Sequence, residues 1–333
     1  MRNLGRRFAD ARLRDVPVLR AADLDGRADP TGATRIWLAL EVLQVTGSFK
    51  VRGALVAAEA NRAFGRLVSA SAGNHGAAVA YAARVLGLAA TVCVPRTTAR
   101  VTCAKIRQYG AELVISPSDH EEDAVALAMA IAATHGAAYV PACGSVEVTM
   151  GNGTSLGFEI VRALGGLPER MIAPIGRGGL ATGIAWALGA EAVGRLERGV
   201  WGAQSEASCA MALSLECGRA LPTKPRTSGS ATLADALTGG VAASAFARAR
   251  GALAGVIVVS EEQIAATMAH AYREMGLVLE GSAAVALAPI LVGLPEPVRG
   301  GDLVVVLTGR NVDPERLEAV LARPDREVAP GRI

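Results

Sequence analysis

The run Leu303-Val304-Val305-Val306-Leu307-Thr308 is the stretch of this sequence that decides its fold class. Its first five residues are apolar, without the alternation of polar and apolar side chains that marks a strand with one face in water. Such strands are typical of the centre of a parallel sheet, where helices cover both faces. We therefore expect residues 303–308 to form a central strand of an α/β fold.

Short β-rich runs alternate with alanine-rich helical stretches along the rest of the chain. The other runs cover residues 36–40, 67–70, 90–94, 112–115, 171–174 and 256–259. This alternation predicts an open, mostly parallel twisted sheet flanked by helices, and 333 residues exceed one typical core, so we expect two such domains. Ligands of these sheets bind at the carboxyl ends of the strands, so the loops after the runs are the places to search for chemistry.

Composition narrows the classes of function. The formal net charge is +3, and no basic block indicates binding to nucleic acid or to a membrane surface. Residues 1–14 are polar and lack the apolar core of a signal peptide, and no apolar run has the length of a membrane span, so we expect a cytoplasmic protein. The five cysteines form neither a CxxC pair nor a Cys/His metal spacing.

Lysine is scarce, since Lys50, Lys105 and Lys224 are the only three in the chain. Lys50 ends the run Thr46-Gly47-Ser48-Phe49-Lys50 and precedes an apolar stretch that predicts a buried helix. A lysine amine withdrawn from bulk water becomes nucleophilic towards aldehydes and carbonyl groups, which arginine cannot do. Lys105 falls in an amphipathic helix predicted at 98–109 and Lys224 in a proline-flanked turn, so we expect both to be solvated. Local features leave Lys50 as either a nucleophile or an ordinary lysine at a helix start.

Four loops after β-rich runs carry unusual residues. Ser71-Ala72-Gly73-Asn74-His75 precedes a helix predicted at 77–86, and Gly176-Arg177-Gly178-Gly179-Leu180 precedes a helix predicted at 184–188. Small residues that open a helix present backbone N–H groups to an anion, such as a carboxylate or a phosphate. The other two loops are 202–206 and Thr308-Gly309-Arg310-Asn311. Taken alone, each could be an ordinary turn, and Asn74 could be only a helix cap.

Taken together, the motifs resemble those of the fold-type II pyridoxal-phosphate enzymes, which have a tryptophan synthase β-like fold. Within them, the chain is similar to the serine/threonine dehydratase group, which also contains serine racemase. The resemblance implies a homodimer in which residues 1–65 and 144–333 form a large cofactor-binding domain and 66–143 a small one. The motifs that carry it are 46–54, 71–75, Tyr109-Gly110-Ala111-Glu112, Gly151-Asn152-Gly153-Thr154, 176–180, Thr232-Leu233-Ala234-Asp235, Glu280-Gly281 and 308–311.

The resemblance implies that pyridoxal 5'-phosphate is the cofactor, and it implies a role for each motif. Lys50 would form the Schiff base and then move the Cα proton, with Phe49 against the pyridine ring. Asn74 would donate to the 3-hydroxyl oxygen, and Thr308 would face the pyridine nitrogen. The phosphate would bind backbone N–H groups of the glycine loop, and the substrate carboxylate those of the asparagine loop. The glycine loop is Gly176, Arg177, Gly178, Gly179 and Leu180, and the asparagine loop is Ser71, Ala72, Gly73, Asn74 and His75.

Thr308 affects which reaction the cofactor would favour. A hydroxyl partner, unlike a carboxylate, does not favour a protonated pyridinium, so the ring withdraws electrons weakly. Prompt loss of a β-hydroxyl group after removal of the Cα proton is then the easy path. We expect β-elimination from an L-β-hydroxy amino acid such as L-threonine or L-serine, which yields a 2-keto acid and ammonia.

The main alternatives are a racemase and a β-replacement synthase. Racemases of this group resemble a pattern with serine directly before the Gly-Asn pair, where this chain has Ala72, and alanine has no proton to give. The lysine motif and the loop at Thr308 look less like those of the synthases. A catalytically silent ligand-binding relative would lack the lysine, and Lys50 is intact.

Three further departures from the group's pattern bear on metal and substrate. Gln204 stands where metal-binding members carry glutamate, so we expect no divalent-metal site there. Arg177 and Arg310 replace glycines. Either both side chains point to solvent, or a guanidinium reads an additional anionic group on the substrate, which would favour β-hydroxyaspartate over threonine. Arg310 is the candidate substrate-binding residue for the second case.

Overall fold

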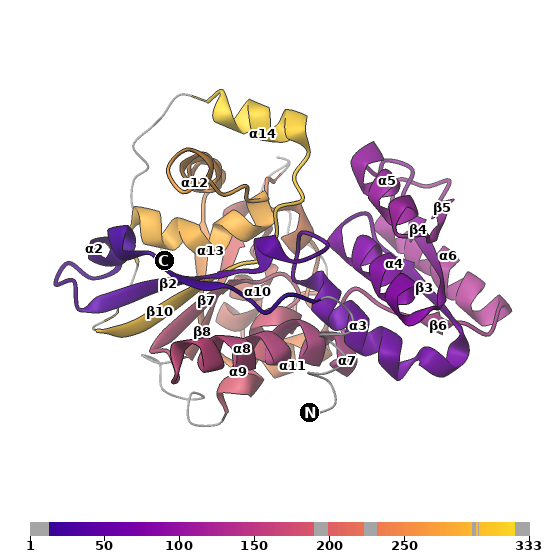
Figure 1. Ribbon diagram of the computed structural model, residues 1–333, viewed down its shortest axis with the longest axis horizontal. Coiled ribbons are helices and arrows are strands. Elements are labelled where there is room, and N and C mark those ends of the chain that lie inside the picture. Colours follow the sequence, from indigo (N-terminus) through magenta and orange to yellow (C-terminus); the bar gives the residue numbers. More distant parts are fainter. Residues whose placement is uncertain (1–12, 190–198, 223–231, 295–297, 299, 324–333) are drawn as a thin grey trace. The chain divides into compact units, whose positions relative to one another are not determined.

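The computed structural model describes residues 13–189, 199–222, 232–294, 298 and 300–323 (Figure 1). The chain divides into two compact units. Unit 1 comprises Met1–Asp15 with Gln44–Asn152, and unit 2 comprises Val16–Leu43 with Gly153–Ile333. Lys224 and most of the proline-rich stretch around it lie outside the described residues.

Unit 2 is built on a six-stranded sheet in the order β1-β2-β10-β7-β8-β9. Neighbouring strands are parallel except β1, which runs antiparallel to β2. The run that opened the sequence analysis forms β10 between β2 and β7, and its residues Leu303 to Leu307 are fully buried, which confirms the predicted central strand. The strands are β1 (Val18–Arg20), β2 (Thr34–Leu40), β7 (Arg170–Pro174), β8 (Gly199–Ser205), β9 (Leu253–Val259) and β10 (Gly301–Leu307).

Helices cover both faces of this sheet, with α12 and α13 on one side and α8 and α9 on the other (Figure 1). Helix α13 is buried along its first ten residues, because apolar or small side chains occupy its whole circumference. Its side chains share one core cluster with β2, β10 and α12. The helices are α2 (Asp25–Ala28), α8 (Ser155–Leu164), α9 (Gly179–Leu188), α10 (Ala210–Glu216), α11 (Ala243–Arg250), α12 (Glu261–Arg273), α13 (Gly281–Val292) and α14 (Pro314–Leu321).

Unit 1 contains a parallel four-stranded sheet in the order β5-β4-β3-β6. Helices α3 and α4 share one core cluster with β3 and β4, and α6 packs on the opposite face through three buried alanines. The elements are α3 (Lys50–Ala60), β3 (Arg66–Ala70), α4 (Asn74–Leu86), β4 (Ala89–Val94), α5 (Arg100–Gln108), β5 (Glu112–Ile115), α6 (Glu121–Thr134), β6 (Ala138–Tyr139) and α7 (Val146–Thr149).

Short helical turns complete the described chain. The 3-10 turns are η1 (Ala22–Leu24), η2 (Glu41–Leu43), η3 (Arg62–Phe64), η5 (Glu206–Ser208) and η6 (Asp235–Leu237), and a π-helical turn, η4, spans Met150–Thr154. Throughout the part of the chain that the structure describes, every helix is too short or too polar to cross a membrane.

All seven predicted strands are present, and three short or unusual strands went unpredicted: β1, β6 and β8. The interpretation of 202–206 as a loop was wrong, because Gly202 to Ser205 pair with β9 inside β8, and Gly202 and Ala203 also pair with β7. Glycine is needed there, since a Cβ on Gly202 would lie 2.6 Å from Cγ2 of Ile175. The predicted domain boundaries stay a prediction. They place α3 and α7 in the large domain, whereas the contacts of the chain group both helices with unit 1.

Candidate active site

Lys50 is the first residue of α3, at the end of a tight turn in unit 1. Gly47 makes the turn possible, because its φ of 75° is unfavourable for other residues, and its N–H donates to the Gln44 carbonyl at 2.8 Å. The Lys50 side chain is half-buried, and its Nζ lies 5.1 Å from the centre of the Phe49 ring. The amine therefore lies beside an aromatic face, as the sequence predicts.

The first turn of α3 is locked by the Gly151-Asn152 motif. Oδ1 of Asn152 accepts the N–H of Gly53 at 2.9 Å, and a Cβ on Gly53 would lie 2.6 Å from the same oxygen. A Cβ on Gly151 would approach the Gly53 Cα to 2.6 Å. Two predicted motifs, about 100 residues apart in the sequence, thus form one close backbone contact that supports Lys50.

The asparagine loop follows β3 and leads directly into α4, which begins at Asn74, three residues earlier than predicted. Gly73 is the N-cap residue and has no side chain to cap the first N–H groups of α4. The Ser71 hydroxyl accepts the N–H of Gly73 at 3.2 Å, and Ala72 is exposed. This end of α4 can bind a carboxylate.

His75 is buried, with 2% of its surface exposed, and its Nε2 lies 3.2 Å from the carbonyl oxygen of Val140. Burial lowers the pKa of this imidazole to about 3, and the charge of Lys50 adds to the shift. His75 is therefore neutral, with its Nε2–H donated to the carbonyl. The side chain ties the asparagine loop to the end of β6, and the influence of Lys50 marks the two as neighbours within unit 1.

Lys105 is not solvated, contrary to the prediction. It is half-buried on α5, and its Nζ donates to the Thr46 carbonyl oxygen at 2.6 Å. The helical pattern of residues 98–109 predicts which face of α5 meets solvent. A lysine on that face can still reach a polar group of the protein, because its side chain is long. Lys50 thus follows the turn at Gly47, and Lys105 donates a hydrogen bond to the same turn.

The glycine loop of unit 2 joins β7 to α9, which begins at Gly179. Gly178 is buried at a φ of 89° and caps α9 without a side chain, so the first N–H groups of this ten-residue helix lack a side-chain acceptor. A Cβ on Gly176 would lie 3.2 Å from the Leu237 Cα. The loop therefore presents backbone N–H groups and the positive helix end, which suits a phosphate.

Arg177 lies against Gly239: a Cβ at that glycine would come within 2.9 Å of its Nη2. The side chain is half-buried, which differs from the fully solvated alternative. Gly239 has a φ of 111°, so a larger residue is excluded both by conformation and by the guanidinium. Arg177 thus braces the glycine loop against the segment that ends at Gly239.

That neighbouring segment contains the Thr232-Asp235 motif and is held by buried polar contacts. Glu261, the first residue of α12, accepts the Thr232 hydroxyl at 2.6 Å and the N–H of Leu233 at 2.7 Å. Its Oε1 also accepts the hydroxyl of Ser205, at the end of β8. Arg316 of α14 donates to the Asp235 carboxylate at 2.6 Å. Sequence analysis did not single out Glu261 or Arg316, because both partners are distant in the sequence.

Thr308 follows β10 and is 2% exposed. A Cβ on Gly309, the next residue, would lie 2.5 Å from Oε1 of Glu280, so a side chain there would displace this carboxyl group. Glu280 is itself buried at the start of α13, so a carboxyl group borders the Thr308 turn. The sequence had predicted no role for the Glu280-Gly281 motif. Arg310 is exposed, and its Nη1 donates to the Val42 carbonyl.

Gln204 is buried in β8, and its Oε1 accepts the N–H of Ala212 at 3.0 Å. The residues that the structure describes contain no group of three or more His, Cys, Asp or Glu side chains able to hold a metal ion. Gln204 acts there as a neutral link between β8 and α10.

The predicted site residues thus form two sets. Unit 1 brings together the lysine turn and the asparagine loop, and unit 2 holds the glycine loop, the Thr308 turn and Arg310. Each set contains an uncapped helix start after a parallel strand, the kind of position where such sheets bind ligands.

Known proteins share this arrangement. The chain is 36% identical over 287 residues to a Sinorhizobium fredii protein that is provisionally named a threonine dehydratase, with 84% of this chain and 83% of the relative covered. It is 34% identical to the L-threonine ammonia-lyase of Thermotoga maritima, covering 86% and 69%. A solved crystal structure of a threonine deaminase from T.th. has a TM-score of 0.81 and 30% identity, covering 94% of this chain and 98% of that one.

Residues 12–309 match the family described as "Pyridoxal-phosphate dependent enzyme". That span includes the lysine turn, the asparagine loop, the glycine loop and Thr308. With the similarity to the relatives above, this match assigns the cofactor as well as the fold. The chain belongs to the pyridoxal-phosphate dependent enzymes, and pyridoxal phosphate is its cofactor.

Proposed function

We propose that the chain is a lyase that removes water and then ammonia from an L-β-hydroxy amino acid, with L-threonine or L-serine as substrate and a 2-keto acid as product. The observation that carries the proposal is the half-buried Lys50 at the start of α3, beside the Phe49 ring. The relatives named threonine dehydratase and threonine ammonia-lyase support the same reaction class.

The residues of the chain fit the cofactor. The glycine loop offers uncapped backbone N–H groups for the phosphate, and no Cβ fits at Gly176 or at Gly178 without moving a neighbour. Lys50 would supply the amine for covalent attachment, Phe49 would offer a face for the ring, and Asn74 would donate to its 3-hydroxyl oxygen. Thr308 supplies a buried hydroxyl for the ring nitrogen. The cofactor, when bound, provides the electron-withdrawing ring that acidifies the substrate Cα–H.

Lys50 also moves the proton. With substrate bound, the Lys50 amine would accept the Cα proton and would return a proton to the departing β-hydroxyl group. His75 does not compete for this role, because burial keeps it neutral and its Nε2–H is held by Val140. The hydroxyl of Thr308 does not stabilise a protonated ring nitrogen, which favours elimination over a long-lived carbanion.

The substrate carboxylate binds the asparagine loop, where Ser71, Ala72, Gly73, Asn74 and His75 surround the uncapped start of α4. A β-hydroxyaspartate substrate would need a second cation, for which Arg310 is the candidate. That arginine is exposed and already donates to a backbone carbonyl, which favours threonine and serine. Racemisation is disfavoured because the exposed Ala72 carries no acid or base.

We also propose a cytoplasmic homodimer. The support is the resemblance to the dehydratase group. Sedimentation equilibrium of the purified protein tests the dimer.

The decisive experiment is a visible absorption spectrum with pyridoxal phosphate, followed by a panel of L-threonine, L-serine and L-threo-3-hydroxyaspartate. We expect a band that is lost in Lys50→Ala, together with equal amounts of keto acid and ammonia from threonine or serine. A band without keto acid would leave the cofactor in place and refute the elimination reaction.

A further inference from the structure

Two side chains near the end of α5 donate to consecutive carbonyl groups of the turn that precedes Lys50. Nζ of Lys105 lies 2.6 Å from the Thr46 oxygen, and Oη of Tyr109 lies 3.4 Å from the Val45 oxygen. Thr46 is 1% exposed, so the shorter of these bonds lies away from bulk water. An ammonium donor at this distance makes a charge-assisted hydrogen bond, which is stronger than a neutral one.

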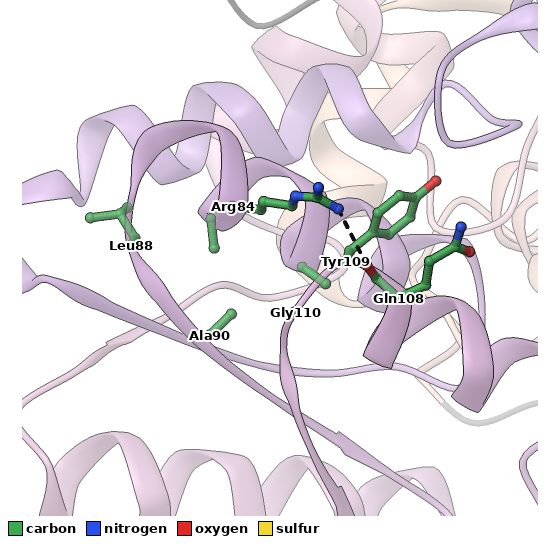
Figure 2. A pocket seen from close by; sticks show the side chains of 8 residues that line it. Arg84, Leu88, Ala90, Gln108, Tyr109 and Gly110 are labelled. Atoms are coloured by element: carbon green, nitrogen blue, oxygen red, sulfur yellow. Dashed lines mark hydrogen bonds between the residues drawn. The ribbon is translucent and has the colours of Figure 1, made fainter.

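The end of α5 is itself held in place. The rings of Tyr109 and Tyr81 of α4 meet edge to face, 5.3 Å apart at an angle of 78°. Nη1 of Arg84 donates to the Gln108 carbonyl at 3.3 Å across a pocket of about 380 Å³, which Figure 2 shows between α4, β4 and the end of α5. The anchor of the turn is therefore tied to the helix that carries Asn74 and His75.

The turn is also held from its other side. Oε1 of Gln44 accepts the N–H of Arg14 at 3.2 Å, and the Gly47 N–H closes the turn onto the Gln44 carbonyl. Between these points, the two donors near the end of α5 hold the peptide groups that carry the Val45 and Thr46 oxygens. Rotation of either peptide would move the start of α3, where Lys50 lies four residues after Thr46.

We propose that Lys105 is a positioning residue for Lys50: it fixes the turn 44–49 so that the amine of Lys50 points at its reaction partner before the partner arrives. Tyr109 assists through the Val45 carbonyl. The inference rests on the proposed function, because it gives Lys50 the covalent role.

The test compares four variants with the wild-type enzyme. Lys105→Met keeps the aliphatic stem and removes the donor, Lys105→Arg restores a donor, and Tyr109→Phe removes the longer bond but keeps the ring contact. Arg107→Met is the matched control, because it removes an exposed cation from the same helix. The measurements are the cofactor dissociation constant, kcat and KM, and amide hydrogen exchange of residues 47–50 without cofactor.

We expect Lys105→Met to weaken cofactor binding and lower kcat by about tenfold each, the size expected for losing one charge-assisted hydrogen bond. KM should change little, and exchange at 47–50 should accelerate. Lys105→Arg should recover most of each loss, Tyr109→Phe should cost less, and Arg107→Met should match the wild type. If Lys105→Met does not fold, Lys105→Gln takes its place, with a partial loss expected.

Wild-type exchange at 47–50 in Lys105→Met would overturn the proposal, even if the variant were less stable to heat. So would equal losses in Lys105→Met and Arg107→Met. Failure of the proposed function looks different: the absorption band would survive in Lys50→Ala, or the wild type would release no keto acid, whereas the exchange experiment on the cofactor-free protein would still report on the turn.

Discussion

The predicted cofactor-binding residues of the two units are of different kinds. In unit 1 they are side chains, namely the amine of Lys50, the amide of Asn74 and the ring of Phe49, and contacts such as Asn152 to Gly53 hold the start of α3. In unit 2 they are mainly backbone groups, since Gly176 and Gly178 of the glycine loop lack side chains. Chemistry that breaks bonds needs specific functional groups, whereas a phosphate needs only oriented N–H groups and the field of a helix.

This contrast predicts the largest loss of activity for a substitution that keeps the positive charge but removes the nucleophilic amine. Lys50→Arg retains a cation at the start of α3, but a guanidinium stays protonated and cannot form the covalent link or accept a proton. We expect the rate of keto acid formation to fall by about a thousandfold or more, because both roles of the amine are lost.

The same substitution at the other lysine of the turn is the matched control. Lys105→Arg should keep most of the activity, because arginine can also donate a hydrogen bond to the Thr46 carbonyl. Steady-state kinetics of both variants, with circular dichroism to check folding, makes the comparison. Similar losses at the two positions would contradict the division of roles.

A smaller effect is expected for a side chain added to the glycine loop. Gly178→Ala places a Cβ at a φ of 89°, 3.1 Å from Cε of Met211, so the loop must shift and its N–H groups turn away from the phosphate. We expect cofactor affinity to fall by about ten- to a hundredfold, the range for losing a hydrogen bond to a charged group. Fluorescence titration with pyridoxal phosphate measures it.

Gly165→Ala separates loop geometry from general strain. Gly165, at the end of α8 in unit 2, also has a positive φ, 73°, but a Cβ there meets nothing within 4 Å. This variant should lose about 1–2 kcal/mol of folding free energy through the left-handed conformation and keep wild-type cofactor affinity. Equal loss of affinity in the two variants would show that strain alone weakens binding.

The difference between the units also explains what could be predicted from sequence. Side-chain chemistry is visible in residue types, so Lys50 and the asparagine loop could be chosen as candidates, and continuous apolar runs marked β10 and the other buried strands. Strand β8 was missed because it contains Gly202 and Gln204, and it exists because β7 and β9 pair with it on both sides. Strands β1 and β6 have three and two residues, too few for a pattern.

Contacts between residues far apart in the chain could not be predicted in this way. Lys105 and Thr46 are 59 positions apart, and Thr232 and Glu261 are 29 apart. The amphipathic pattern of α5 says which face meets water, but not that a long side chain reaches a carbonyl on another element. Glu280 stood in a quoted motif, yet only the fold brings its carboxyl group to Gly309.

The side-chain set of unit 1 should make the stability of the protein depend on pH. The folded pKa of His75, about 3, lies below the ordinary value of 6.5, so the unfolded chain binds a proton that the folded chain refuses. The stability from neutral His75 is complete above pH 6.5 and is lost as pH falls towards 3. The loss approaches about 1.4 kcal/mol per pH unit inside that window.

Urea unfolding of the wild type and His75→Gln between about pH 4 and pH 8 measures this dependence. Glutamine keeps a side-chain N–H for Val140 but does not titrate, so the variant should have the flatter profile below pH 6.5 and a parallel one above it. His135→Gln, at an exposed position of the same unit, should follow the wild type. Parallel profiles for wild type and His75→Gln in the acidic range would mean that this imidazole stays accessible to protons in the folded state.

The smallest expected effect is on substrate selectivity and concerns Arg310, a side chain of unit 2. If the guanidinium reads a second carboxylate, Arg310→Gly should lower the kcat/KM ratio of L-threo-3-hydroxyaspartate to L-threonine. The side chain is exposed and shares its N–H groups with the Val42 carbonyl, so the ion pair should contribute at most about 1 kcal/mol, or about fivefold in this ratio. Arg316→Gly, which removes an arginine that binds Asp235 instead, should leave the ratio unchanged. An unchanged ratio in Arg310→Gly would assign Arg310 to holding η2 through Val42, and substrate selection would then depend on the side chains of unit 1 and the Thr308 turn alone.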